Sequence, residues 1–189
     1  LDLIVIPGGF SYGDYLRSGA MAAHSPVIRE VVSHSKKGAL VLGICNGFQI
    51  LTESGLLPGV LLRNASLKFI CRNVHLRVES INNPFTKGYT KKQTVKIPIA
   101  HGDGNYFINK KGIKEIEDNE QIAFRYCNAE GEINTESNPN GSLMNIAGIL
   151  NRNKNVLGMM PHPERVSDKF TGGSDGEILF QGIVEGLSK

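Results

Sequence analysis

One segment carries the main structural signal of this 189-residue chain: Val41-Leu42-Gly43-Ile44-Cys45-Asn46-Gly47-Phe48-Gln49. The apolar run at 39–44 predicts a buried strand, and residues 48–54 predict a helix that follows it directly. Cys45 therefore lies at a strand-to-helix corner, with a glycine two residues before it and another two residues after it. This spacing is typical of a nucleophile elbow, a turn so sharp that side chains at the glycine positions would collide with backbone.

Two interpretations of Cys45 compete. A lone cysteine is most often a small buried core residue. At the start of a helix, however, unpaired N–H groups and the positive end of the helix dipole favour the thiolate, which is the nucleophilic form. The glycine spacing, together with the motifs below, favours a catalytic cysteine.

The composition is that of an ordinary globular protein and excludes several classes. Hydrophobic residues make up 40% and charged residues 21% of the chain, and the net charge at pH 7 is +3. This balance predicts neither a nucleic-acid partner nor a membrane partner. No apolar run approaches the roughly 18–20 residues of a membrane span, and we find no signal peptide. The length predicts a single domain over 1–189.

Cysteine usage points to a reducing compartment. Cys45, Cys71 and Cys127 are scattered and form no C-x-x-C pair. Such a pattern predicts neither a disulfide framework nor a zinc site, so we expect a cytoplasmic protein without a bound metal.

Alternating strand and helix signals in the first part of the chain predict a doubly wound α/β fold. Residues 3–6 are apolar throughout, as in a parallel strand covered on both faces. Ser25-Pro26 predicts the N-cap and first residue of a helix that Gly38 ends. In the middle of the chain, the pattern predicts antiparallel strands at 69–78 (with a bulge near Asn73), 95–99 and 122–126, and a loop or short surface helix at 109–120. The last third predicts strands at 146–150 and 156–160, and a final helix that begins after the capping residues 174–177.

A second motif follows the last predicted strand: Met160-Pro161-His162-Pro163-Glu164-Arg165. The two prolines exclude a helix and favour extended geometry, in which residues i and i+2 project to the same side. His162 and Glu164 can then pair, so that the carboxylate orients the imidazole and leaves its other nitrogen to move a proton. An H-x-E pattern is weak by itself, but combined with the elbow it predicts a Cys-His-Glu triad.

Two glycine-rich segments remain. In Pro7-Gly8-Gly9-Phe10-Ser11-Tyr12-Gly13-Asp14, the N–H of Gly9 could form an oxyanion hole with the N–H of Asn46, or the segment could be only a tight turn. His101-Gly102-Asp103-Gly104-Asn105 could bind substrate or simply shape a hairpin. Neither segment has the spacing of a phosphate-binding loop.

Taken together, the elbow and the late Pro-His-Pro-Glu resemble the class I (triad) glutamine amidotransferases. The segments 7–14, 71–72, 76–79, 101–105 and 159–165 are most similar to the glutaminase subunits of phosphoribosylformylglycinamidine synthase, an enzyme of de novo purine synthesis. The resemblance covers about residues 1–187. It implies an α/β, flavodoxin-like fold with a mostly parallel central sheet flanked by helices and a small antiparallel sheet.

The resemblance also implies a reaction and a set of site residues. Cys45 would attack the side-chain amide of glutamine, His162 would shuttle protons, and Glu164 would orient His162. The oxyanion would be held by Gly9 and Asn46. Residues expected to bind glutamine are Gln49, Phe10, Asn64, Ser66 and Phe69.

Partners and cofactors follow from the same resemblance. Ammonia would pass to a separate synthetase subunit that aminates formylglycinamide ribonucleotide, and a small third subunit would complete the complex. ATP and Mg²⁺ would belong to the synthetase, with no cofactor in this chain. The family begins with a further strand and helix, so we expect residues ahead of Leu1.

Two other functions stay open on the residues alone: a glutaminase that serves another synthase, and a Cys-His hydrolase with no use for glutamine. An inert structural subunit is the non-enzymatic alternative.

Overall fold

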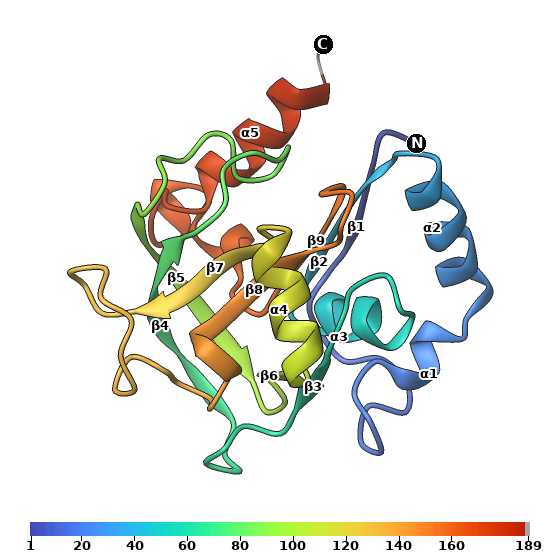
Figure 1. Cartoon of the computed structure of the whole chain (residues 1–189), viewed down its shortest axis with the longest axis horizontal. Helices are drawn as coiled ribbons and strands as arrows, with labels where there is room; N and C mark the ends of the chain where they lie inside the picture. The colour runs from blue at the N-terminus through green and yellow to red at the C-terminus, as the bar shows by residue number, and fades with distance from the viewer. Residues whose placement is uncertain (188–189) are drawn as a thin grey trace.

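A seven-stranded sheet organises the computed structural model, which describes residues 1–187 (Figure 1). The strand order is β1-β2-β9-β8-β7-β4-β5. Parallel ladders join β1 (Leu3–Ile6), β2 (Leu40–Ile44) and β9 (Val156–Met159). Antiparallel ladders add β8 (Ile146–Leu150), β7 (Ile122–Cys127), β4 (Ile70–Val78) and β5 (Thr94–His101). The antiparallel pairing thus extends further than the sequence predicted, because these strands continue the main sheet.

A second, small antiparallel sheet pairs β3 (Val60–Leu62) with β6 (Asn105–Phe107). The α-helices are α1 (Ala20–Ala23), α2 (Pro26–Lys36), α3 (Asn46–Glu53), α4 (Lys110–Asp118) and α5 (Glu177–Leu187). Short 3₁₀ turns are η1 (Leu143–Asn145), η2 (Pro163–Val166) and η3 (Lys169–Thr171). In Figure 1, α2 and α3 lie on the side of β1 and β2, and α5 (red) lies on the other side of the molecule. Within residues 1–187, no helix has the length and apolarity that crossing a membrane requires.

Most predicted elements are confirmed, and their ends follow from local chemistry. The Ser25 hydroxyl accepts a hydrogen bond from the Ile28 N–H at 3.4 Å and begins α2, with Pro26 as its first residue. Gly38 follows the C-cap with φ +99°, a conformation that favours glycine. The segment at 109–120 forms a helix, α4, because the side chain of Asn109 caps it by accepting from the Gly112 N–H at 2.8 Å.

Two predictions about strands are wrong. β1 is an edge strand paired only with β2 within the described part of the chain, and Val5 is 46% exposed, so its faces are not both covered. β4 pairs with β5 in one unbroken register from Ile70 to Arg77, so no bulge occurs at Asn73. The irregular register lies instead between β7 and β8, near Phe124. Polarity alternation along one strand does not reveal which strand pair absorbs an extra residue.

Two glycines inside strands let α3 pack close to the sheet. A Cβ atom on Gly43 of β2 would lie 2.4 Å from Cδ1 of Leu51, and one on Gly158 of β9 would lie 2.2 Å from Cδ2 of Phe48. Leu51 and Phe48 are fully buried there. Because glycine leaves this space, α3 and the corner that precedes it sit directly on β2 and β9.

The sheet curls so that β5 returns to the parallel strands. From β9 to β5 the direction reverses four times, so β5 runs the same way as β1, β2 and β9. The N–H of His162, just beyond β9, donates to the carbonyl of Pro98 in β5 at 2.8 Å. The carboxyl ends of four strands therefore meet at one edge, where α/β proteins place their sites.

Candidate active site

Cys45 occupies the corner between β2 and α3 in a strained conformation. Its φ is +51° and its ψ −105°, outside the regions that non-glycine residues normally adopt. The Cys45 N–H donates to the carbonyl of Met159 at 2.8 Å and ties the corner to the end of β9. This is the geometry of a nucleophile elbow, as the glycine spacing predicted.

His162 and Glu164 are paired, although not in an extended segment. Nδ1 of His162 lies 2.6 Å from Oε1 of Glu164. The backbone turns into η2 at Pro163, because proline at the first position of a helical turn needs no N–H partner. A carboxylate only accepts hydrogen bonds, so Nδ1 carries a hydrogen, and Nε2 is the ring nitrogen left to exchange a proton. Nε2 is buried without a hydrogen-bond partner.

Cys45 and the imidazole of His162 both lie next to Gly8. A Cβ atom on Gly8 would lie 2.6 Å from Cε1 of His162 and 3.3 Å from Cβ of Cys45. Cys45 and His162 line the same cavity, of about 380 Å³. Residues from the two ends of the chain are thus within a side chain's reach of each other, which the triad prediction requires.

The resting thiol differs from the prediction. Burial raises the pKa of Cys45 to about 11, and this outweighs the hydrogen bond from the Asn46 N–H and the charge of Arg165, which lower it. The Sγ–H group donates to the carbonyl of Ala100 at 3.6 Å. The expectation that the helix end would favour a resting thiolate is therefore wrong, because desolvation of the charged form is the larger effect.

The oxyanion-hole candidates, Gly9 and Asn46, lie close to Cys45. Gly9 lines the cavity with φ +134°, and the Asn46 N–H already faces the sulfur. Asp14 holds the two segments together by accepting from the N–H of Ser11 at 2.6 Å and from Nδ2 of Asn46 at 2.8 Å. The hydroxyl of Ser11 donates to Oδ1 of Asn46 at 2.5 Å. The sequence did not predict these two hydrogen bonds to Asp14.

The five predicted glutamine-binding residues divide into two groups. Gln49, Phe10 and Phe69 line the cavity. Gln49 donates from Nε2 to the carbonyl of Asp103 at 2.8 Å, while Phe10 is 89% exposed. Asn64 and Ser66 are not part of the lining. Asn64 is fully buried with its amide bonded to neighbouring chain segments, and Ser66 is exposed and accepts only weakly from the Lys68 N–H, at 3.4 Å.

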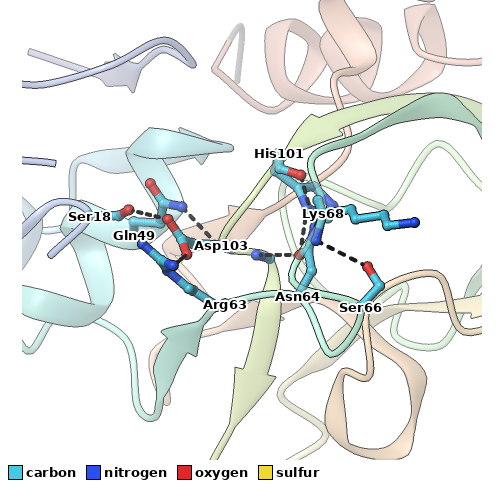
Figure 2. A network of polar contacts seen from close by, with 9 residues as sticks. Ser18, Gln49, Arg63, Asn64, Ser66, Lys68, His101 and Asp103 are labelled. Carbon is cyan, nitrogen blue, oxygen red and sulfur yellow. Dashed lines mark hydrogen bonds and ion pairs between the residues drawn. The ribbon is translucent and has the colours of Figure 1, made fainter. Parts of the chain in front are cut away.

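The glycine-rich turn at 101–105 contributes polar groups that sequence reasoning left unassigned. His101 and Asp103 line the cavity with Arg63 and Arg165. Asp103 accepts from the hydroxyl of Ser18 at 2.8 Å and lies 3.9 Å from Nε of Arg63 (Figure 2). Their positions depend on the curl of the sheet, so no local signal could have placed them. Among residues 1–187, no cluster of three or more His, Cys, Asp or Glu side chains could hold a metal ion.

Comparison with known families identifies this arrangement. A family model described as the CobB/CobQ-like glutamine amidotransferase domain matches residues 1–174. The chain belongs to this family.

Several relatives of this amidotransferase share most of its sequence. The phosphoribosylformylglycinamidine synthase subunit PurQ of Acaryochloris marina is 57% identical over 99% of this chain and 80% of the relative. The PurQ subunit of Rhodospirillum rubrum is 56% identical over 100% of this chain and 82% of the relative. The motif resemblance is thus confirmed over the whole chain.

Solved structures agree with the fold. A chain in the structure of PurLQS from Thermotoga maritima is 45% identical, with a TM-score of 0.85 over 98% of this chain and 80% of that one. A glutamine amidotransferase from Thermotoga maritima, 15% identical over 100% of this chain and 78% of that one with a TM-score of 0.61, shares the fold alone. The predicted class I glutamine amidotransferase fold is confirmed.

Proposed function

We propose that this chain is the glutaminase subunit of phosphoribosylformylglycinamidine synthase and hydrolyses L-glutamine to L-glutamate and ammonia. The observation that carries the proposal is the meeting of Cys45 and the Glu164-oriented imidazole of His162 in one cavity. A 57% identical relative that carries the name of this subunit supports the choice of synthase over other glutamine-dependent enzymes.

The first step is nucleophilic attack on the carboxamide of glutamine. The buried thiol is protonated at rest, so its proton must leave as the sulfur attacks, and His162 takes this proton on Nε2. Sγ bonds to the carboxamide carbon, and the carbonyl oxygen gains the negative charge. The N–H groups of Gly9 and Asn46 face that oxygen in the proposed hole.

Collapse of this tetrahedral intermediate breaks the carbon–nitrogen bond. His162 returns the proton to the departing nitrogen, so ammonia leaves and a γ-glutamyl thioester stays on Cys45. Water, deprotonated by the same imidazole, then attacks the thioester carbon. Glutamate leaves, and the sulfur takes the proton back. Glu164 stabilises the imidazolium in both halves of the reaction.

The cavity has groups that suit a free amino acid. Arg63 and Arg165 offer positive charge to the α-carboxylate, and Asp103 offers negative charge to the α-ammonium group. Phe10 and Phe69 form apolar walls at the opening. These features support free glutamine as the substrate over a glutamine residue inside a peptide, because that residue has neither a free α-carboxylate nor a free α-ammonium group.

The ammonia passes, in this proposal, to an ATP-dependent synthetase subunit that converts formylglycinamide ribonucleotide to formylglycinamidine ribonucleotide. A small third subunit completes the complex. The PurLQS structure, which contains a related chain, supports such an assembly. ATP and Mg²⁺ act in the synthetase, and this chain binds no cofactor. We place the reaction in the cytoplasm, where the three free cysteines of this chain would stay reduced.

The test uses Cys45→Ala in the assembled synthase. We expect loss of glutamine-dependent amination and of glutamate release, while amination driven by added ammonium chloride stays at the wild-type rate. Retention of that ammonia-driven rate shows that the complex is intact. A glutamine-dependent rate that survives the substitution would overturn the proposal. Labelling of wild type by 6-diazo-5-oxo-L-norleucine, followed by peptide mapping, should place the adduct on Cys45.

A further inference from the structure

Two histidines that line the cavity, His101 and His162, each have a buried Nε2 without a hydrogen-bond partner. Nε2 of His162 is accounted for by proton transfer to and from Cys45. Nε2 of His101 belongs to a ring that is only 2% exposed, and the mechanism above does not use it. An unpaired polar atom buried in a cavity is costly, so His101 Nε2 calls for a partner that the site receives with its substrate.

The hydrogen-bond network around Asn64 determines which nitrogen of His101 carries the hydrogen (Figure 2). Nδ2 of Asn64 donates to two carbonyls, those of Lys68 at 2.8 Å and His101 at 2.9 Å. Oδ1 of Asn64 accepts from the N–H of Gly104 at 3.0 Å. These three contacts fit only one assignment of the Asn64 amide, with Nδ2 as the donor and Oδ1 as the acceptor. Oδ1 also lies 3.0 Å from Nδ1 of His101, so Nδ1 must be the donor and Nε2 a bare acceptor.

The ring stays neutral and stays in place. Burial and the neighbouring His162 lower the pKa of His101 to about 4, although the carboxylate of Asp103 acts in the opposite direction. Gly104 packs against the ring so closely that a Cβ atom there would lie 2.4 Å from Cε1 of His101. His101 is therefore a fixed acceptor at neutral pH.

The cavity is polarised around the sulfur of Cys45. The N–H of Asn46 donates a hydrogen bond to this sulfur, and Gly9 lines the same cavity. The carbonyl of Ala100, which accepts from the thiol, lies on the side of β5, and His101 is the next residue. A carboxamide is complementary to these groups, because its oxygen accepts hydrogen bonds from N–H donors and its nitrogen donates hydrogen bonds to acceptors. If the oxygen occupies the oxyanion hole, the nitrogen can point toward the end of β5, where Ala100 and His101 lie.

Building on the proposed function, we propose that His101 is a specificity-determining residue whose Nε2 accepts a hydrogen bond from the carboxamide nitrogen of glutamine. The departing nitrogen keeps its hydrogens throughout the reaction, so the contact persists until ammonia leaves. The γ-methyl ester of glutamate has no hydrogen on its leaving oxygen and gains nothing from His101. The site therefore selects a primary amide over an ester.

The test compares L-glutamine with L-glutamate γ-methyl ester in the full-length protein assembled with its partners, by glutamate release. His101→Asn keeps a donor to Oδ1 of Asn64 but removes the acceptor at the Nε2 position. His101→Gln places an amide oxygen near the Nε2 position but loses the bond to Asn64. We expect kcat/KM for glutamine to fall about 10- to 100-fold in His101→Asn, with the ester within about threefold of wild type. In His101→Gln, the ratio of kcat/KM for glutamine to kcat/KM for the ester should lie between the His101→Asn value and the wild-type value.

A purely structural role for His101 predicts the opposite order, because His101→Asn would then be the milder change. Equal losses for both substrates, or no loss for glutamine, would overturn the inference. His75→Asn is the matched control, since His75 lies on β4 outside this cavity, and it should leave both rates unchanged. If wild type itself hydrolyses neither substrate, the proposed function fails, and the inference fails with it.

Discussion

Cys45 combines a strained backbone with an environment that opposes its charged form. The elbow projects the thiol into the cavity, yet burial raises its pKa to about 11, compared with 9.0 for an ordinary thiol. At pH 7 the thiolate fraction is then only about 10⁻⁴. In the proposed reaction the nucleophile therefore forms when His162 takes the proton, because the helix end does not offset the effect of burial on the thiol.

This state of Cys45 predicts a pH dependence of alkylation. In the free protein, the rate of Cys45 modification by iodoacetamide should rise about tenfold per pH unit from pH 7 and should not level off below about pH 10. The sign follows from the raised pKa, because the reactive thiolate accumulates only as the pH approaches 11.

Peptide mapping separates Cys45 from the exposed Cys71 and the buried Cys127. A rate for Cys45 that reached its plateau by pH 8 would contradict the burial argument. It would show that the dipole of α3 and the Asn46 N–H dominate instead.

At the scale of elements, the site depends on how closely α3 approaches β1 and β2. Gly47, in the first turn of α3, lies against the end of β1, where a Cβ atom would lie only 2.1 Å from the carbonyl oxygen of Ile6. The same close approach brings the Gly8-Gly9 segment, which follows β1, next to Cys45. Gly47 therefore does more than permit the turn at Cys45, because it also lets α3 and the end of β1 lie close together.

Gly47→Ala should force α3 away from β1. We expect a loss of about 1–3 kcal/mol in the free energy of unfolding, measured by urea titration, because overpacking against backbone cannot be relieved by a side-chain rotation. Glutamine hydrolysis should fall more steeply than stability, since Cys45 and Asn46 move with the helix.

Gly186→Ala is the matched control for this substitution. Gly186 lies in α5, and the nearest atom to an added Cβ is Nζ of Lys87 at 3.0 Å, the end of a flexible side chain. Stability should be unchanged or rise by up to about 1 kcal/mol, as for alanine in a helix. If both variants behaved alike, steric contact at Gly47 would not be the cause.

At the scale of the whole molecule, the cavity exists because the sheet curls. Its lining comes from the segments after β1, β2 and β9 and from the end of β5 with the turn that follows it. Arg63 and Phe69 come from the chain between β3 and β4. A ligand that bridges these segments should stabilise the entire fold, since unfolding would separate all of them.

Binding of L-glutamine to Cys45→Ala should therefore raise the melting temperature of the protein. At 100 times the dissociation constant the gain is about 2.7 kcal/mol. For a chain of this size that corresponds to a shift of about 5–10 °C. Differential scanning fluorimetry measures it. D-glutamine at equal concentration should give no shift, and a missing shift with L-glutamine would contradict a cavity that binds the free amino acid.

Much of this molecule could be predicted from local patterns. The Cys45 elbow, the His162–Glu164 pair and the cap at Ser25 each depend on residues within a few positions of one another. The structure contains all three, although His162 and Glu164 pair across a turn and not in the expected extended segment. Turn geometry, proline and capping act over that same short range, so they can be read along the chain.

The tertiary structure decided the rest. The return of β5 to His162, the tautomer of His101, and the high pKa of Cys45 depend on strand order, on curl and on burial by segments far away in sequence. Local chemistry determines which residues can react, since it resides in side-chain type and short spacing. Long-range packing determines their protonation, because the cost of a charge depends on everything that excludes water from it.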